Sequence, residues 1–280
     1  QTSVVELAEL MIGRKGESMV QAAPRTPPQD RVAMSIRDLH VDMPGEEVRG
    51  VSLEVYEGEI LGIGGLAGQG KLGIPNGVMS LYDTRGSVTL FGEELKLGNA
   101  GDALRAGIAM VSEDRKGVGL LLDQSIEDNI VFNAMQIKGE YLHRLGLFTL
   151  KNSSAVRKTA ERMIHDLDIR CFGPMQHTGT LSGGNQQKVC IARALVMDPR
   201  FLFVSEPTRG IDVGAKDQIY EIIEGLAQQG MAVIVISSEI PELQLMCDRI
   251  CVMSQGKVTT VIDRSEFADS DNILRNAIGI

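Results

Sequence analysis

The N-terminal half of the chain shows the alternation of apolar and polar residues that is typical of strands with one buried face. The alternation begins at Ala33 and leads to the continuous apolar run 60–63, which predicts a strand that is buried on both faces. Residues 86–92 predict a further hairpin strand, and residues 108–111 predict a further buried strand. This half therefore predicts an antiparallel sheet that leads into a parallel core.

Helical and strand patterns alternate along the C-terminal half of the chain. The segment 125–178 is predicted to be mostly helical. One apolar face of this segment is formed by Val156, Ala160, Met163, Ile164 and Leu167. The elements that follow are predicted as helix 185–197, strand 201–204, helix 213–229, strand 232–236, helix 240–247 and strand 249–253. Helices that alternate with continuous apolar strands favour an α/β fold with a mostly parallel sheet.

The two ends of the chain lie outside this pattern. Residues 4–12 have helical spacing and are followed by a segment rich in Gly and Pro, which predicts a short helix and a linker. Residues 272–279 predict another helix that ends in Ile-Gly, as the first helix does. This similarity between the two helix ends indicates an internal duplication. The predicted boundaries are 1–31 for the tail of a preceding homologous domain plus linker, 32–263 for the main domain with a helical subdomain at 120–180, and 264–280 for a helical tail.

Composition and charge narrow the class of protein. The chain has 280 residues, of which 43% are apolar, as is ordinary for a globular protein. The net charge of −9 disfavours a general nucleic-acid binder, because neutralising phosphates needs a basic surface. The longest apolar runs, such as 232–236, are far shorter than the ~20 residues of a transmembrane helix. The four cysteines, Cys171, Cys190, Cys247 and Cys251, lack the paired spacing of a zinc site and are predicted to be buried, reduced thiols. Reduced thiols fit a cytosolic compartment.

The strongest chemical signal is a run with a hydroxyl and two glycines at a predicted helix start. It comprises Leu181, Ser182, Gly183, Gly184, Asn185, Gln186 and Gln187. The hydroxyl, the glycines that let backbone N–H groups approach closely and the helix dipole together predict an anion-binding corner. A buried strand that ends in Ser205-Glu206-Pro207 follows this corner.

A second phosphate-binding signal follows the buried strand 60–63. Gly65, Gly68, Gly70, Lys71 and Leu72 lie in a segment that matches the P-loop pattern G-x-x-x-x-G-K-[ST] in all but its last position. Backbone amides of such a loop bind phosphate oxygens, and the lysine reaches the terminal phosphates.

Together these motifs resemble the ATPases of ABC transporters, and the resemblance covers nearly the whole chain. It implies a P-loop NTPase core with a mostly parallel sheet, an antiparallel β subdomain and a helical subdomain. It also implies ATP and Mg²⁺ as cofactors. In this family LSGG is the signature motif, which closes over ATP held by the P-loop of a partner domain. The segment that contains Asp212 resembles the family's D-loop, and the alternative is that Asp212 only caps helix 213–229.

Several positions depart from the family pattern, and each departure removes a charge or a ligand. Leu72 stands where a Ser or Thr hydroxyl coordinates Mg²⁺, and Ser205 stands at the Walker B aspartate. Glu113 stands at the Q-loop glutamine, and Ser238 stands at the switch histidine. Only Glu206 keeps the family's water-activating glutamate. Because each such group is worth ~10²–10³ in kcat, we expect this site to hydrolyse ATP poorly or not at all.

The further strings SEDRKG at 112–117 and SIEDNI at 125–130 resemble the second ATP-binding domain of bacterial importers of ribose, galactose, xylose or nucleosides. This resemblance implies a homologous N-terminal ATPase domain, membrane permease subunits and, indirectly, a periplasmic or lipoprotein solute-binding protein as partners. It implies a location at the cytoplasmic face of the inner membrane. The permease helices are expected near Glu113 and residues 118–135, where the apolar Val118, Leu120, Leu121 and Leu122 line either a groove or the core.

Three other functions remain open from the sequence. The first alternative is a soluble ABC protein that acts on nucleic acid or the ribosome, and the acidic charge of the chain disfavours it. The second alternative is an autonomous ATPase in which Glu113 or Glu206 replaces the missing metal ligands. The last alternative is a regulatory module that binds a nucleotide without hydrolysing it.

Overall fold

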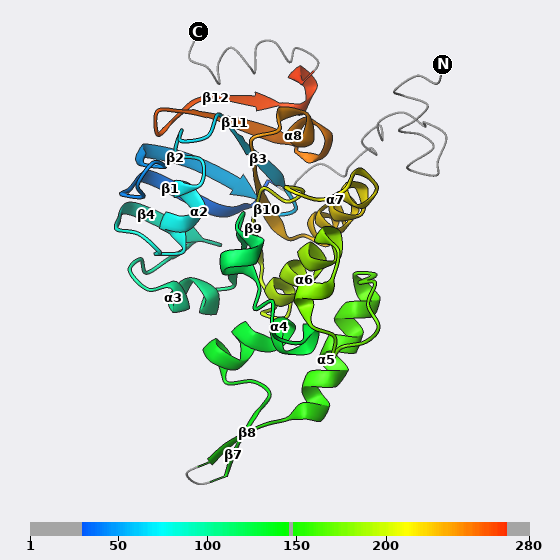
Figure 1. Ribbon diagram of the computed structural model, residues 1–280. Helices are drawn as coiled ribbons and strands as arrows, with labels where there is room; N and C mark the ends of the chain where they lie inside the picture. Colours follow the sequence, from blue (N-terminus) through cyan, green and yellow to red (C-terminus); the bar gives the residue numbers. More distant parts are fainter. Residues whose placement is uncertain (1–29, 146–147, 268–280) are drawn as a thin grey trace, which may run out of the picture.

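The computed structural model describes residues 30–145 and 148–267, so the predictions for residues 4–12 and 272–279 lie outside the described residues. Within these ranges the main sheet has six strands in the order β12-β11-β3-β10-β9-β6 (Figure 1). All neighbouring strands are parallel except β11 and β12. The strands are β3 (Ile60–Gly64), β6 (Ile108–Val111), β9 (Phe201–Ser205), β10 (Ala232–Ser237), β11 (Arg249–Ser254) and β12 (Lys257–Asp263). The mostly parallel sheet is therefore confirmed, and β12 is an element that the sequence analysis missed.

A second, antiparallel sheet lies against one face of the main sheet (Figure 1). Its strand order is β2-β1-β4-β5, and its members are β1 (Val32–Val41), β2 (Val48–Tyr56), β4 (Thr84–Leu90) and β5 (Glu93–Glu94). Side chains on β10 alternate between two cores: Ile234 packs in the cluster between the two sheets, and Val235 packs in the cluster on the helical side. Burial on both faces explains why β10 is a continuous apolar run.

Five helices of the described part of the chain cover the other face of the main sheet and extend away from it (Figure 1). They are α4 (Ile126–Asn133), α5 (Ser153–Asp166), α6 (Gly183–Leu195), α7 (Val213–Gln228) and α8 (Ile240–Met246). The short helices α2 (Gly73–Val78) and α3 (Ala100–Arg105) pack instead in the cluster between the two sheets. The predicted apolar face of α5 is confirmed, since Val156 and Ala160 are fully buried. Within the described residues, no helix has the length and apolar character needed to span a bilayer.

The segment 125–178, predicted to be mostly helical, contains two strands between α4 and α5 that the sequence analysis missed. A hairpin of β7 (Leu142–Leu145) and β8 (Phe148–Lys151) lies there and projects from the helices (Figure 1). All four residues of β8 are exposed, including Phe148 and Leu150, so this strand has no buried face to impose a recognisable pattern. Strands of four residues are also too short for a period to be read with certainty.

The predicted burial of the cysteines holds for three of the four. Cys190 and Cys251 are buried, and burial raises the pKa of each thiol to about 12. Cys247 is also buried, whereas Cys171 is partly exposed. The buried positions lie in α6, at the end of α8 and in β11, where they fill apolar space.

Candidate functional site

Lys71, Glu206 and Ser238 come from three different loops and meet in one hydrogen-bonded group. The Lys71 ammonium lies 3.2 Å from Glu206 Oε1 and donates to Ser238 Oγ at 2.6 Å. Ser238 donates to the same Glu206 oxygen through its hydroxyl at 2.7 Å and through its backbone N–H at 3.1 Å. The lysine side chain is only 2% exposed. Three of the predicted site residues are therefore brought together, and the charge of Lys71 is already paired.

The backbone places Glu206 directly beyond the end of β9. Its N–H donates to the carbonyl of Ile236 in β10 at 2.7 Å, and its φ of 46° is in the left-handed region that non-glycine residues rarely adopt. This local strain is of a kind that clusters at functional sites. The strand ends thus direct this carboxylate toward the P-loop lysine.

The metal-binding positions of this P-loop do not fit Mg²⁺. Leu72 offers no oxygen and packs partly against the apolar cluster between the sheets. The Ser205 hydroxyl is fully buried and has no hydrogen-bond partner among residues 30–145 and 148–267. The described residues also contain no group of three or more His, Cys, Asp or Glu side chains that would hold a metal ion. The helix after the loop, α2, has six residues, and it contains Gly73, Pro75 and Gly77, which all disfavour a helix.

Glu46 is a site residue that the sequence analysis missed. Its carboxylate accepts hydrogen bonds from the backbone N–H of Gly68 at 2.8 Å and from that of Leu72 at 3.1 Å. The side chain comes from the turn between β1 and β2, and the residue is buried. A single acidic residue in a turn has no motif around it, so no pattern in the sequence could have identified this contact.

The signature residues form the start of α6, and their hydroxyl is exposed. Ser182 is the N-cap residue, but its side chain makes no capping hydrogen bond. Instead its Oγ accepts from the Asn185 side-chain amide at 2.9 Å, and Asn185 Oδ1 accepts from the backbone N–H of Arg170 at 2.8 Å. The first N–H groups of a helix have no partner within the helix. The start of α6 therefore presents a hydroxyl and backbone donors that no side chain caps.

The remaining signature residues have structural contacts. Leu181 is buried, and the buried Gln186 side chain donates to the Leu181 carbonyl at 3.2 Å and to the Thr178 carbonyl at 3.4 Å. A Cβ on Gly183 would lie 2.8 Å from the Gly210 carbonyl oxygen, and a Cβ on Gly184 would lie 2.7 Å from Ala215 Cβ. Both glycines are thus required for close packing of α6 against the segment that begins α7.

Asp212 caps α7, which is the structural alternative that the sequence analysis kept open. Its side chain accepts from the backbone N–H of Ala215 at 3.1 Å. A cap of this kind stabilises the first turn of the helix. The capping role and a contact across a domain interface are compatible, because Asp212 is exposed.

Glu113 lies after β6 and is not part of the Lys71 group. Its carboxylate accepts from the Ser112 hydroxyl at 3.2 Å, and a π-helical turn, Arg115–Gly119, follows. Of the two roles predicted for the apolar residues of this region, only the one in the core is seen, and the groove stays a prediction. Val118 and Leu121 are exposed, whereas Leu120 is buried and Leu122 packs partly against the helical core.

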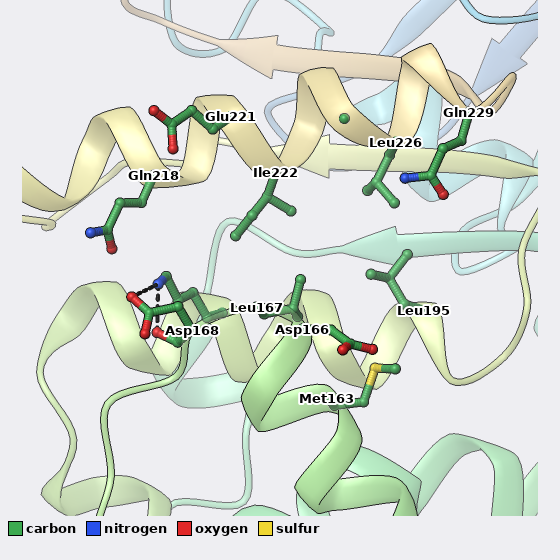
Figure 2. A pocket seen from close by; sticks show the side chains of 12 residues that line it. Met163, Asp166, Leu167, Asp168, Leu195, Gln218, Glu221, Ile222, Leu226 and Gln229 are labelled. Atoms are coloured by element: carbon green, nitrogen blue, oxygen red, sulfur yellow. Dashed lines mark hydrogen bonds and ion pairs between the residues drawn. The ribbon is translucent and has the colours of Figure 1, made fainter.

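A cavity of about 600 Å³ lies between α5, α6 and α7, apart from both phosphate-binding motifs. Figure 2 shows Leu167, Ile222 and Leu226 pointing into it and Asp168 at one end, where the Lys188 ammonium donates to the Asp168 carbonyl at 2.7 Å. Burial lowers the pKa of Lys188. None of the residues singled out from the sequence motifs lines this cavity.

The parallel sheet with a P-loop after β3, an antiparallel sheet beside it and a helical arm that leads to α6 define an ATP-binding cassette. Residues 48–209 match the family model described as ABC transporter. The chain therefore belongs to the ABC transporter family.

Relatives and solved structures agree with this assignment. The chain is 41% identical over 276 residues to "Ribose import ATP-binding protein RbsA 2" of Rhizobium meliloti, covering 98% of the chain and 52% of that protein. It is 37% identical over 285 residues to "Xylose import ATP-binding protein XylG" of Moorella thermoacetica, covering 100% of the chain and 54% of that protein. The chain thus spans about half the length of the curated relatives it matches. The ATP-binding cassette MJ1267 of an ABC transporter shares the fold, with a TM-score of 0.73, 17% identity and coverage of 89% of this chain and 99% of that one.

Proposed function

We propose that this chain is the second ATP-binding domain of a fused importer ATPase for a simple sugar or a nucleoside. In this proposal the signature residues close over ATP that is held by the P-loop of a homologous preceding domain. The preceding domain supplies the lysine, the metal ligands and the base, and this chain supplies Ser182 and the amides of Gly183 and Gly184. Its own nucleotide site does not hydrolyse ATP.

The observation that carries the proposal is the contrast between the two phosphate-binding motifs. Ser182 is exposed and its hydroxyl caps no N–H group, so it is available to a ligand brought by another domain. Lys71 is buried against Glu206 and Ser238, and Leu72 and Ser205 provide no metal shell. The names of the ribose and xylose import relatives, and the fact that the chain spans about half their length, support the fused importer.

The partners in this proposal are the preceding ATPase domain, two membrane permease subunits and, indirectly, a periplasmic or lipoprotein solute-binding protein. ATP with Mg²⁺ binds in the site shared between the two ATPase domains. The exposed Val118 and Leu121, close in sequence to Glu113, are the residues we assign to the permease contact. Through that contact the domain lies at the cytoplasmic face of the inner membrane.

The test compares two variants of the full-length fused protein. Ser182→Glu places a negative charge where the ATP phosphates arrive, and we expect it to lower the rate of ATP hydrolysis by ~10²-fold or more. Glu206→Gln keeps an oxygen for Lys71 and Ser238, and we expect it to leave the rate nearly unchanged. Thermal unfolding of both variants shows whether the fold is retained. Loss of turnover in Glu206→Gln with normal turnover in Ser182→Glu would refute the proposal, because the working site would then be this chain's own.

A further inference from the structure

The P-loop of this chain already holds an anion, and that anion is one of its own side chains. One Glu46 oxygen accepts from the N–H of Gly68 at 2.8 Å, and the other accepts from the N–H of Leu72 at 3.1 Å. In a P-loop the backbone N–H groups of this segment are the donors that bind phosphate oxygens. A carboxylate that accepts two backbone hydrogen bonds satisfies these donors in the same way, with the added strength of its charge.

The turn between β1 and β2 holds this carboxylate in place. Glu46 is 8% exposed, and its N–H donates to the Met43 carbonyl at 3.0 Å. The backbone of the turn lies directly on the P-loop: a Cβ on Gly70 would lie 2.6 Å from the Glu47 carbonyl oxygen, and a Cβ on Gly73 would lie 2.2 Å from that of Glu46. Only glycine permits this close approach of the two backbones, so the fold itself places Glu46 next to the P-loop.

The lysine of the P-loop also has an internal carboxylate as its partner. Lys71, which in a P-loop reaches the terminal phosphates, lies 3.2 Å from Glu206 Oε1. One internal carboxylate therefore accepts hydrogen bonds from the amides, and another pairs with the ammonium. A polyphosphate that enters this loop has to displace Glu46 from the amides while both groups carry negative charge.

We propose that Glu46 acts as an internal phosphate mimic and excludes polyphosphates from this P-loop. The inference extends the proposed function, since it names the residue that keeps the chain's own site from binding a nucleotide. It does not depend on the signature motif, so its test involves neither Ser182 nor ATP turnover.

The test is the affinity of this chain for ATP, with and without Mg²⁺, and for inorganic pyrophosphate, by titration calorimetry. Glu46→Ala is expected to bind pyrophosphate about tenfold to hundredfold more tightly than the unchanged chain, because one competing charge-assisted contact shifts an equilibrium by that order. ATP is expected to follow pyrophosphate if the adenosine part also fits. A gain for pyrophosphate alone assigns the effect to the phosphates.

Glu47→Ala is the matched control, since it makes the same change of charge at the next residue. Glu47 is exposed, and its carboxylate accepts from the N–H of Gly45 at 3.3 Å, within the same turn and outside the P-loop. Equal affinities for Glu46→Ala and the unchanged chain would overturn the proposal. An equal gain in Glu47→Ala would also overturn it, because the effect would then be one of net charge.

Two further measurements keep the proposal testable if Glu46→Ala fails to fold. The first uses Glu46→Gln, which retains the size and one acceptor oxygen while it removes the charge, and we expect its affinity for pyrophosphate to rise as well. The second uses the unchanged chain. In the unchanged chain without ligand, the amide hydrogens of Gly68 and Leu72 are expected to exchange slowly with solvent. Rapid exchange at both amides would show that Glu46 does not hold them.

Discussion

The close contact between the signature helix and α7 leads to a prediction in which the same substitution has different effects on stability at two positions. Gly184 is buried in the first turn of α6, and a Cβ there would lie 2.7 Å from Ala215 Cβ. Gly225 is inside α7 and lines the cavity, and a Cβ there would meet nothing within 4 Å. Neither glycine has a φ in the left-handed region, so alanine is compatible with the backbone at both positions.

The magnitudes follow from helix propensity and packing. Alanine is more favourable than glycine in a helix interior by ~1 kcal/mol, so Gly225→Ala is expected to raise the free energy of unfolding by about that amount. Carbon atoms separate at about 3.5–4.0 Å, so Gly184→Ala needs α6 and α7 to move apart by nearly 1 Å. Such overpacking costs ~1–3 kcal/mol, which offsets the gain in propensity. Gly184→Ala is therefore expected to be less stable than Gly225→Ala by ~1–3 kcal/mol.

The assay is urea unfolding of the unchanged chain and both variants, followed by circular dichroism. The slope of the transition is expected to stay the same, so that differences in the midpoint report stability. If Gly184→Ala were stabilised as much as Gly225→Ala, the contact with Ala215 would not restrict this position. The signature glycine would then have no packing role, and only its approach to a ligand would explain it.

Two further predictions concern buried charges outside the P-loop. Burial raises the pKa of Glu242, whose carboxylate accepts from the Thr208 hydroxyl at 2.6 Å, so the folded state binds a proton more tightly than the unfolded state does. The stability contributed by this proton is expected to be lost as pH rises from the ordinary glutamate pKa through the raised one. Over that pH range, the unfolding midpoint of Glu242→Gln should therefore fall less than that of the unchanged chain. Arg249→Ala is expected to lower the free energy of unfolding by ~3–5 kcal/mol, because it leaves the fully buried Glu59 carboxylate without the cation that contacts both of its oxygens, at 2.6 and 3.1 Å. An Arg249→Ala loss below about 1 kcal/mol in urea unfolding would place this pair among weak surface ion pairs.

The sequence predicted the elements whose pattern is imposed by the core. The strands β3, β9 and β10 are buried on both faces, so their apolar runs are continuous and easily recognised. The hairpin β7–β8 was missed because its strands are short and β8 is exposed along its whole length, apolar residues included. The same distinction holds in the site. Spacing along the chain identified Lys71 and Glu206, whereas the contact of Glu46 with the P-loop depends on how the β1–β2 turn folds back over it.

The two phosphate-binding motifs of this domain differ in how their polar groups are satisfied. In the P-loop, the amides of Gly68 and Leu72 and the ammonium of Lys71 all have internal carboxylate partners. A ligand gains little there, because each hydrogen bond that it makes replaces one that already exists, and only the difference contributes to binding. At the start of α6, the Ser182 hydroxyl is exposed and no side chain caps the first turn, so a phosphate replaces only water. The gain from phosphate binding is therefore larger at the signature motif than at the P-loop, and this difference favours ATP brought by a partner domain over ATP held by this one.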